Sequence, residues 1–194
     1  MKAIVCSEWC KPEDLKVSEI EKPSIDNVSV RVEVHAAGVN FPDVLIVQGK
    51  YQYKPPFPFS PGSEVAGIVS EIGNDVKNIN VGDRVMAVTG HGAFAEEVCV
   101  PYNKITIIPP EMDFTTAASM SLTYGTSAYA LFQRANIKEN DTVLIHGATG
   151  GVGITAIEIS KAMRAKVIAT ASTEEKLDIA REYGADYCIN YSKN

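Results

Sequence analysis

The sequence lacks the segments that would define a membrane or secreted protein. Within its 194 residues no apolar run approaches the roughly 18 residues that cross a bilayer. The amino-terminal segment also lacks the long apolar stretch of a secretory signal. Only four cysteines are present, and none forms a CxxC pair. These absences favour free thiols in a reducing compartment, so we expect a cytoplasmic protein without a membrane partner.

Positive charge is also scarce. The 18 lysines and arginines are outnumbered by 24 aspartates and glutamates, which gives a formal net charge of −6. Nucleic acids and anionic membranes both need a basic face for binding. We therefore expect neither as the main partner.

The first part of the chain, residues 1–120, consists of short β-rich runs separated by turn residues. Residues 28–34, VSVRVEV, alternate apolar and polar side chains as a half-buried strand does. A proline-rich loop at residues 54–62 excludes both a helix and a central strand there. This pattern predicts a small barrel or sandwich. Strands are expected at residues 2–6, 28–37, 64–72, 84–88, 94–100 and 105–108.

The second part, residues 121–194, alternates strands with helices. Two helices, 114–122 and 127–134, are expected around its start, joined by residues 123–126. Strands at 142–146, 166–170 and 186–190 then enclose two helices, of which the second opens on a capping box at Ser172–Glu175. The order βαβαβ is half of a doubly wound dinucleotide-binding sheet. A complete sheet has about six strands, so we expect the chain to be truncated at its C-terminus.

One motif between the first of these strands and its helix carries the chemistry. Residues 147–153, GATGGVG, match G-x-G-x-x-G with Ala148 in place of the first glycine. A small residue at 148 permits the turn, Gly150 lets the backbone approach a pyrophosphate, and Gly153 lets the helix pack against the strand. The helix N-terminus would face the phosphates. The alternative is a plain glycine-rich turn.

The end of the second strand indicates the cofactor. NAD-specific sites usually place an acidic residue there to bind the ribose 2′-hydroxyl. Here the strand runs into Ala171 and Ser172, and no carboxylate would repel a 2′-phosphate. Ser172 and Lys176 could bind that phosphate, which predicts NADPH. The alternative is that Ser172 only caps the helix and Lys176 is only a solvated lysine.

Several stretches together resemble the medium-chain dehydrogenase/reductase superfamily, and within it the zinc-free NADPH:quinone oxidoreductase branch of the zeta-crystallin type. The resemblance implies α/β plus β: a GroES-like β-barrel domain at 1–120, then the first half of a Rossmann domain at 121–194. It also implies a homodimer, formed through a portion outside this chain. The stretches that carry it are GVNFPD at 38–43, PGSEVAG at 61–67, VGDRV at 81–85, TYGT at 123–126 and the glycine motif.

The resemblance also implies site residues. The positions that bind zinc in the superfamily's alcohol dehydrogenases hold Asn40, Ser63 and Leu122 here, and none is a normal zinc ligand, so we expect no metal. Tyr51 matches a tyrosine near the substrate cleft, whereas Leu45 and Val47 replace a family tyrosine and arginine. The cofactor-binding candidates are Asn40, Thr126, Ala148, Thr149, Gly150, Gly151, Val152, Gly153, Ser172, Lys176 and Tyr191.

These features predict an oxidoreductase that passes hydride from NADPH to a quinone or an enone without metal. Such acceptors need close approach and a hydrogen-bond donor, for which Asn40 and Tyr51 are candidates. No residue is assigned as the catalytic acid. The alternatives are an enoyl-thioester reductase of the acryloyl-CoA type, an NADPH-binding protein without catalysis, and an inactive fragment.

Overall fold

Residues 1–193 are described by a computed structural model, and their contacts divide them into two units, one of residues 1–122 and one that begins at Thr123. We refer to them as the β-rich unit and the α/β unit. None of the helices among residues 1–193 is long and apolar enough to cross a membrane.

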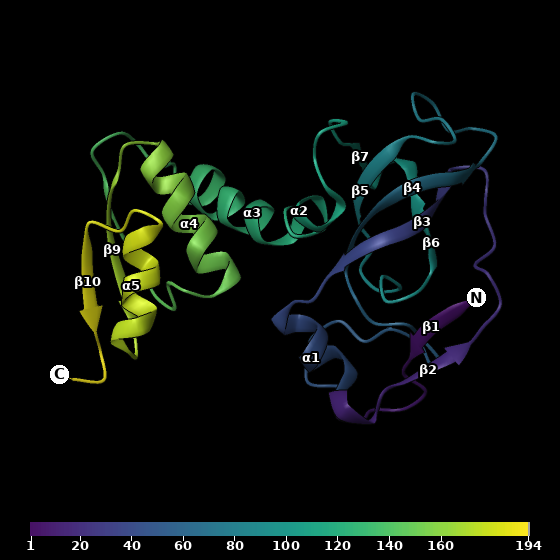
Figure 1. Cartoon of the computed structure of the whole chain (residues 1–194), viewed down its shortest axis with the longest axis horizontal. Helices are drawn as coiled ribbons and strands as arrows, with labels where there is room; N and C mark the ends of the chain where they lie inside the picture. The colour runs from purple at the N-terminus through teal and green to yellow at the C-terminus, as the bar shows by residue number, and fades with distance from the viewer. Residues whose placement is uncertain (194) are drawn as a thin grey trace. The chain divides into compact units, whose positions relative to one another are not determined.

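The β-rich unit is built on a five-stranded antiparallel sheet, seen at the right of Figure 1. The side chains of Val30 and Val32 are fully buried, while Glu33, which follows Val32 in the same strand, is exposed, as the alternation predicts. Valines from neighbouring strands, such as Val65 and Val85, complete this core. The strand order is β6-β3-β4-β5-β7, with β3 at Ser29–Gly38, β4 at Glu64–Ile72, β5 at Arg84–Val88, β6 at Glu97–Pro101 and β7 at Ile105–Ile107.

The strand expected at residues 94–100 begins later, at Glu97. The segment before it is hydrogen-bonded to other partners: Phe94 donates to the Pro61 carbonyl, and Ala95 bridges to Ala3. A hairpin that sequence reasoning did not predict as a pair, β1 (Lys2–Val5) with β2 (Lys16–Glu19), therefore sits against this segment.

Helix α1 (Phe41–Val47) was also missed. Its apolar, β-branched composition favours a strand, but its first turn has strong helix signals. The Asp43 carboxylate accepts the backbone N–H of Asn40 at 2.8 Å, and Pro42 occupies the first turn. The Asn-x-x-Asp spacing was the sequence signal for this helix.

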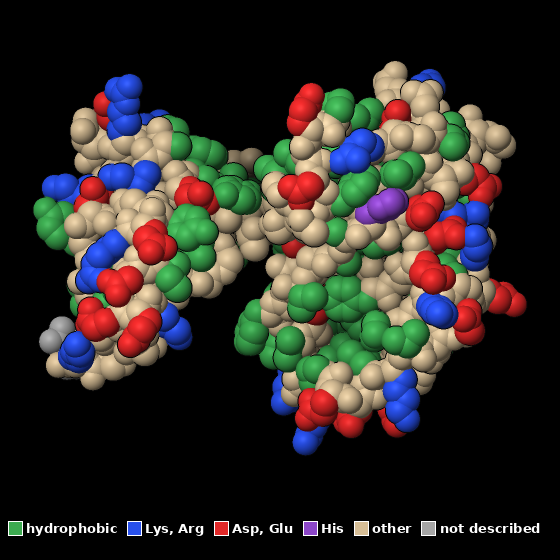
Figure 2. Space-filling view, in the orientation of Figure 1, with side chains coloured by type: hydrophobic (Ala, Val, Ile, Leu, Met, Phe, Trp, Pro, Cys, Tyr) green, Lys and Arg blue, Asp and Glu red, His purple; other side chains and the backbone are tan. Residues whose placement is uncertain are grey.

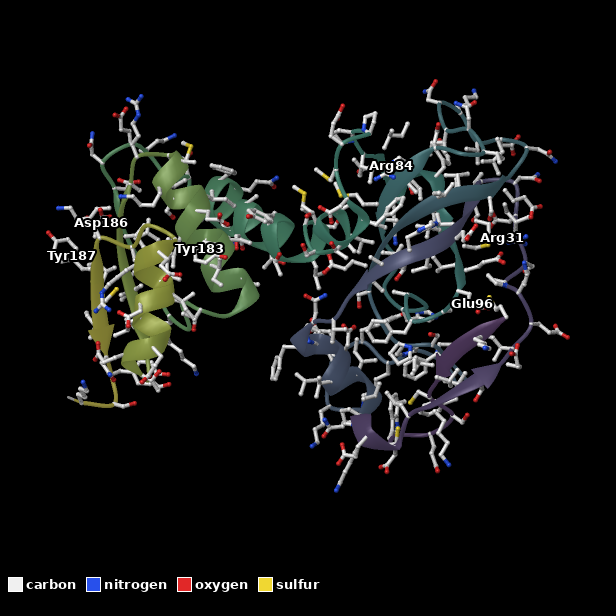
Figure 3. The ribbon with its side chains drawn as sticks, in the orientation of Figure 1. Arg31, Arg84, Glu96, Tyr183, Asp186 and Tyr187 are labelled. Atoms are coloured by element: carbon white, nitrogen blue, oxygen red, sulfur yellow. The ribbon has the colours of Figure 1, made fainter. Side chains whose placement is uncertain are left out.

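Helix α2 (Phe114–Ala118) packs on β3, β4 and β5. The Asp113 side chain caps it by accepting the N–H of Thr116 at 2.8 Å. Arg84, labelled in Figure 3, lies with its guanidinium carbon 4.1 Å from the centroid of the Phe114 ring and donates to the carbonyl of Met112. These contacts hold α2 against β5.

The next helix corrects the prediction of a break at residues 123–126. Helix α3 (Ser121–Ala128) runs through that segment and continues as a π-helix at Tyr129–Arg134, while the break falls at 119–120. Gly125 misled the sequence reasoning, because a glycine inside a helix is tolerated where packing supports the helix.

The α/β unit holds a parallel sheet of order β10-β9-β8, at the left of Figure 1. Helices α4 and α5 cover one of its faces, and Ile157, Val167 and Ala180 are fully buried between them. The expected βαβαβ order is confirmed. Its elements are β8 (Thr142–Ile145), α4 (Gly151–Ala162), β9 (Lys166–Ala171), α5 (Glu174–Glu182) and β10 (Tyr187–Asn190).

Candidate functional site

The glycine motif forms the turn between β8 and α4. Gly147 has φ +59°, so the left-handed conformation falls on Gly147 rather than on position 148. Ala148 is fully buried and donates its N–H to the Thr170 carbonyl at 3.2 Å, which ties the turn to β9. Thr149 is half-buried beside it. The small residue at 148 therefore serves packing, and the sharp turn depends on its glycine neighbour.

Gly150 is the N-cap of α4 and is exposed. A Cβ added there would meet only the Gly147 carbonyl oxygen, at 3.5 Å, so the outer side of this backbone is open. Ile154 is the first residue of α4 whose N–H reaches a carbonyl, that of Gly150 at 2.9 Å. The preceding N–H groups, of Gly151, Val152 and Gly153, lie at the helix end that leaves donors without intrahelical partners.

Gly153 has the opposite environment. It is buried, and a Cβ there would lie 2.7 Å from the carbonyl carbon of Ala148. Helix α4 therefore touches the turn backbone at this residue, as the motif predicts. Val152, with 46% of its surface exposed, points away from the core.

Helix α3 is attached to the start of α4. The buried Ser127 hydroxyl donates to the Val152 carbonyl at 2.9 Å and lies 2.8 Å from the Thr155 hydroxyl. Thr155 also donates to the Thr123 carbonyl at 3.2 Å. The exposed candidate Thr126 is thereby held on α3, next to a residue that bonds the first turn of α4.

The corner after β9 differs from the expected capping box. Thr173, not Ser172, is the N-cap of α5, and its hydroxyl accepts the Lys176 N–H at 3.3 Å. The cap therefore lies one residue later than predicted, and Ser172 is not the capping residue. Ser172 is half-buried at the end of β9, and Lys176 is exposed in the first turn of α5.

Tyr191 lies at this same corner. Its N–H donates to the Ala171 carbonyl at 3.2 Å, directly before Ser172, and its side chain is exposed. Glu174 is bound elsewhere: its Oε1 accepts from Asn190 Nδ2 and from Lys193 Nζ, both at 3.0 Å. These two bonds hold the pKa of Glu174 below its ordinary value. The negative charge of Glu174 is therefore paired with Lys193, which follows β10.

Asn40 belongs to a buried network in the β-rich unit. Its Nδ2 donates to Glu64 Oε1 at 2.8 Å, and the Leu122 N–H donates to Glu64 Oε2 at 2.9 Å. Ser63 Oγ donates to Asp43 Oδ1 at 3.0 Å. The three positions matched to zinc ligands, 40, 63 and 122, thus each bond one of two carboxylates that are at most 3% exposed.

Both carboxylates are buried and closely surrounded. Burial raises the pKa of Asp43, opposed by the Asn40 N–H and the Ser63 hydroxyl. A Cβ at Gly38 would lie 2.7 Å from the Ala118 carbonyl oxygen and closer still to Glu64, so only glycine fits there. Among residues 1–193, no group of three or more His, Cys, Asp or Glu side chains is placed to hold a metal ion.

Tyr51 lies in a different part of the β-rich unit. It is half-buried and packs against a small apolar cluster that includes Ile46, Val47 and Phe59. Val47 is 2% exposed, so the residue that replaces the family arginine belongs to the core. Leu45 is half-buried.

Sequence reasoning missed a pair formed by Tyr53 and His91. The Tyr53 hydroxyl lies 2.8 Å from His91 Nδ1, and burial lowers the pKa of His91. The neighbouring Gly90 carbonyl accepts from Ser63 Oγ at 3.4 Å. This pair couples a phenol to an imidazole near the Ser63 end of the network, and no sequence spacing between residues 53 and 91 indicated it.

Hydrophobic side chains gather on the surface around α1 and the β1–β2 hairpin, as Figure 2 shows in green. An open hollow of about 570 Å³ lies there, lined mostly by apolar residues that include Ile4, Val39 and Phe94. Neither Asn40 nor Tyr51 lines it. We therefore do not assign it to the candidate site.

The structure thus divides the candidates between the two units, with two groups in each. In the α/β unit, the glycine turn and Thr126 gather around the start of α4, and Ser172, Lys176 and Tyr191 gather at the end of β9. In the β-rich unit, Asn40 joins the Glu64 network, while Tyr51 lies in a separate cluster.

Family comparisons match both units. The family described as "Alcohol dehydrogenase GroES-like domain" matches residues 26–110, and the family described as "Zinc-binding dehydrogenase" matches residues 151–194. The three positions matched to zinc ligands, 40, 63 and 122, lie outside the residues that match the family described as "Zinc-binding dehydrogenase". Together the matches confirm a GroES-like unit followed by a Rossmann-type unit.

Individual relatives are similar over nearly the whole chain. A quinone oxidoreductase-like protein 2 from Mus musculus is 38% identical over 99% of this chain, and a quinone oxidoreductase from Sus scrofa is 38% identical over 98%. The solved structure of Escherichia coli quinone oxidoreductase complexed with NADPH is 35% identical, with a TM-score of 0.92 over 100% of this chain and 60% of that one. The chain spans 55% and 59% of the two curated relatives.

Proposed function

Because this chain belongs to the medium-chain dehydrogenase/reductase superfamily, we propose that it acts in an NADPH-dependent oxidoreductase that reduces a quinone or an enone. The observation that carries the proposal is the open backbone at Gly150, beside the N-terminal donors of α4. The similarity to quinone oxidoreductases, one of them solved with NADPH, supports the same assignment.

The residues at the start of α4 fit a pyrophosphate. Gly150 has no side chain to block approach, and the exposed residues Gly151 and Val152 present their N–H groups at this helix end to phosphate oxygens. The dipole of the 12-residue helix α4 favours negative charge at this end.

The corner after β9 fits the adenosine 2′-phosphate. Since Thr173 caps α5, the Ser172 hydroxyl is available to a ligand, and Lys176 offers an ammonium group one turn away. The Tyr191 backbone is bonded to Ala171, which places this residue beside the same corner. No carboxylate ends β9, and Glu174 is paired with Lys193. We therefore propose NADPH rather than NADH.

When bound, NADPH supplies a hydride from its nicotinamide ring. The chain's own residues then position groups and stabilise charge. Because Glu64 accepts one N–H of the Asn40 amide, the orientation of that amide is determined, and its second N–H can serve a ligand. Tyr51 offers a phenolic donor for negative charge on the reduced acceptor.

We also propose that the reaction needs no metal. The side chains of Asn40 and Ser63 already donate hydrogen bonds to buried carboxylates. The side chain of Leu122 has no atom that could bind a metal ion. The polarising role of a Lewis acid would then fall to hydrogen-bond donors, which suits quinones and enones better than alcohols.

The proposed partner is a small electrophile in the cytoplasm, and the proposed assembly is a homodimer. Four free cysteines support a reducing compartment. Sedimentation at several concentrations and cell fractionation test these two proposals.

The main experiment follows NADPH oxidation with a panel of quinones, enones and enoyl thioesters, with and without a strong chelator. We expect turnover of quinones or enones that is unchanged by chelation. Tight NADPH binding without turnover of any acceptor would favour a non-catalytic NADPH-binding protein. Turnover that is restricted to enoyl thioesters, or lost with the chelator, would contradict the proposal.

A further inference from the structure

Two of the four cysteines are in contact at the beginning of the β-rich unit. The Sγ atoms of Cys6 and Cys10 lie 4.0 Å apart. Cys6 is 1% exposed, whereas Cys10 is partly open to solvent. The Cys6 thiol also contacts the Glu8 carbonyl oxygen at 3.1 Å, whereas the thiols of Cys99 and Cys188 each contact a backbone carbonyl rather than a second sulfur. The structure therefore sets one pair of thiols apart from the other two.

The backbone on either side of this pair is anchored. Cys6 exchanges both backbone hydrogen bonds with Phe59, at 2.8 and 3.0 Å, and Cys10 donates its N–H to the Val47 carbonyl at 2.9 Å. The three residues between them, 7–9, are exposed and lie in bends without ladder pairing. The segment is therefore held at both ends and can deform in the middle.

We propose that Cys6 and Cys10 form a redox modification site, which closes to an intramolecular disulfide when a peroxide oxidises Cys10. The inference is independent of the proposed NADPH chemistry. It rests on the contact between the two sulfurs and on their unequal exposure.

The reaction balances in two steps. The Cys10 thiol takes one oxygen from the peroxide to become a sulfenic acid, and for hydrogen peroxide one water leaves. The Cys6 sulfur then attacks the Cys10 sulfur, the S–O bond breaks, and the hydroxyl leaves as water with the Cys6 proton. Two thiols lose two electrons in total, and the peroxide gains them. Burial raises the pKa of Cys6 to about 11, which leaves the more exposed Cys10 as the thiol that meets the oxidant.

Closure would be felt outside the two cysteines. An S–S bond is about 2.0 Å long, so the sulfurs must approach by about half of their present separation, and residues 7–9 must move. Trp9 is the only tryptophan of the chain. Its ring lies 4.5 Å from that of Phe57, and it packs so close to Gly49 that a Cβ added there would lie 2.8 Å from the ring. Tyr51 packs in the same cluster as both cysteines.

The test uses a Cys99→Ser/Cys188→Ser variant, which keeps only this pair. After mild hydrogen peroxide we expect the intact mass to fall by about 2 Da, the loss of two hydrogens, with both thiols protected from alkylation. Tryptophan emission should change in parallel. Dithiothreitol should restore the mass, the alkylation and the emission.

The matched control adds Cys10→Ser to that variant. It should show neither the mass loss nor the change in emission under peroxide. A gain of about 32 Da on Cys10, the sulfinic acid, without a disulfide would overturn the proposal. A disulfide that joins two chains, or free thiols that survive peroxide unchanged in the two-cysteine variant, would overturn it as well.

Discussion

Nδ2 of Asn40 donates to Oε1 of Glu64 across 2.8 Å, and the other carboxylate oxygen of Glu64 accepts the Leu122 N–H. Glu64 is 1% exposed, so these bonds replace most of its hydration. Asn40, which we propose to lie beside the cofactor, is thereby positioned by a carboxylate in the core. We expect this network to decide both the stability of the β-rich unit and the orientation of the Asn40 amide.

The first prediction tests this carboxylate. In Glu64→Gln, the new amide can accept from only one of the two donors, because its nitrogen faces the other. A buried donor left unpaired costs about 1–3 kcal/mol, so we expect the free energy of unfolding in urea to fall by that amount. The control is Glu111→Gln at an exposed position, which should leave it unchanged. Equal unfolding midpoints for Glu64→Gln and wild type would contradict a structural role for this carboxylate.

The second prediction separates binding from folding in the glycine turn. Gly150→Val adds atoms where only the Gly147 oxygen is near, so the protein should fold while NADPH affinity is lost. Gly153→Ala puts a methyl group against the Ala148 backbone and should lower the melting temperature instead. Calorimetry and NADPH titration on both variants check this. Unchanged affinity in Gly150→Val would exclude the turn as the phosphate site.

The third prediction concerns cofactor choice. A hydrogen bond to a charged group is worth roughly 1.5–3 kcal/mol, and 1.4 kcal/mol is about a factor of ten in affinity. Lys176→Ala should therefore weaken NADPH binding about 10- to 100-fold and leave NADH binding nearly unchanged. Lys77→Ala, in an exposed position of the β-rich unit, makes the same charge change and should have no effect on either cofactor. An equal loss for both cofactors would refute a 2′-phosphate site at this corner.

The fourth prediction concerns alkaline pH. Tyr124 donates its hydroxyl to Glu158 at 2.5 Å, and this bond together with burial raises the pKa of Tyr124 from 10.0 to about 12. A pKa raised in the folded state means that the unfolded tyrosine loses its proton first, so stability is lost as pH rises from about 10 to 12. Urea unfolding should show a smaller loss over this interval in Glu158→Gln than in wild type. Glu182→Gln, exposed at the end of α5, is the control.

Much of the fold could be predicted from local patterns. The period of two in β3 and the strand–helix order after residue 141 are properties of adjacent residues, and the structure confirms both. The errors arose where a tertiary contact or a cap decides the outcome. Helix α1 forms from strand-like residues because Asp43 bonds the Asn40 N–H, and α3 passes through Gly125 because Ser127 binds α4.

The candidate site was only partly predictable. The glycine turn is contiguous in sequence, so its residues could be named, although the left-handed glycine proved to be Gly147. Glu64, the Tyr53–His91 pair and the Cys6–Cys10 contact could not be found in the same way. The role of Glu64 and the Tyr53–His91 contact depend on which strands and loops become neighbours in the fold. The two cysteines are close in sequence, but a spacing of four residues predicts a contact only within a helix, and this segment is not helical.

The two buried carboxylates also restrict how this scaffold can evolve. Replacing Asn40 by an apolar residue would take the side-chain donor from Glu64, and replacing Ser63 by an apolar residue would take the side-chain donor from Asp43, in each case at a buried carboxylate. Each such single substitution is thus penalised by a buried acceptor that has lost one of its donors. The amides and hydroxyls that now satisfy the two buried acids are therefore coupled to one another through the core, so a substitution at position 40 or 63 cannot be judged by its own side chain alone.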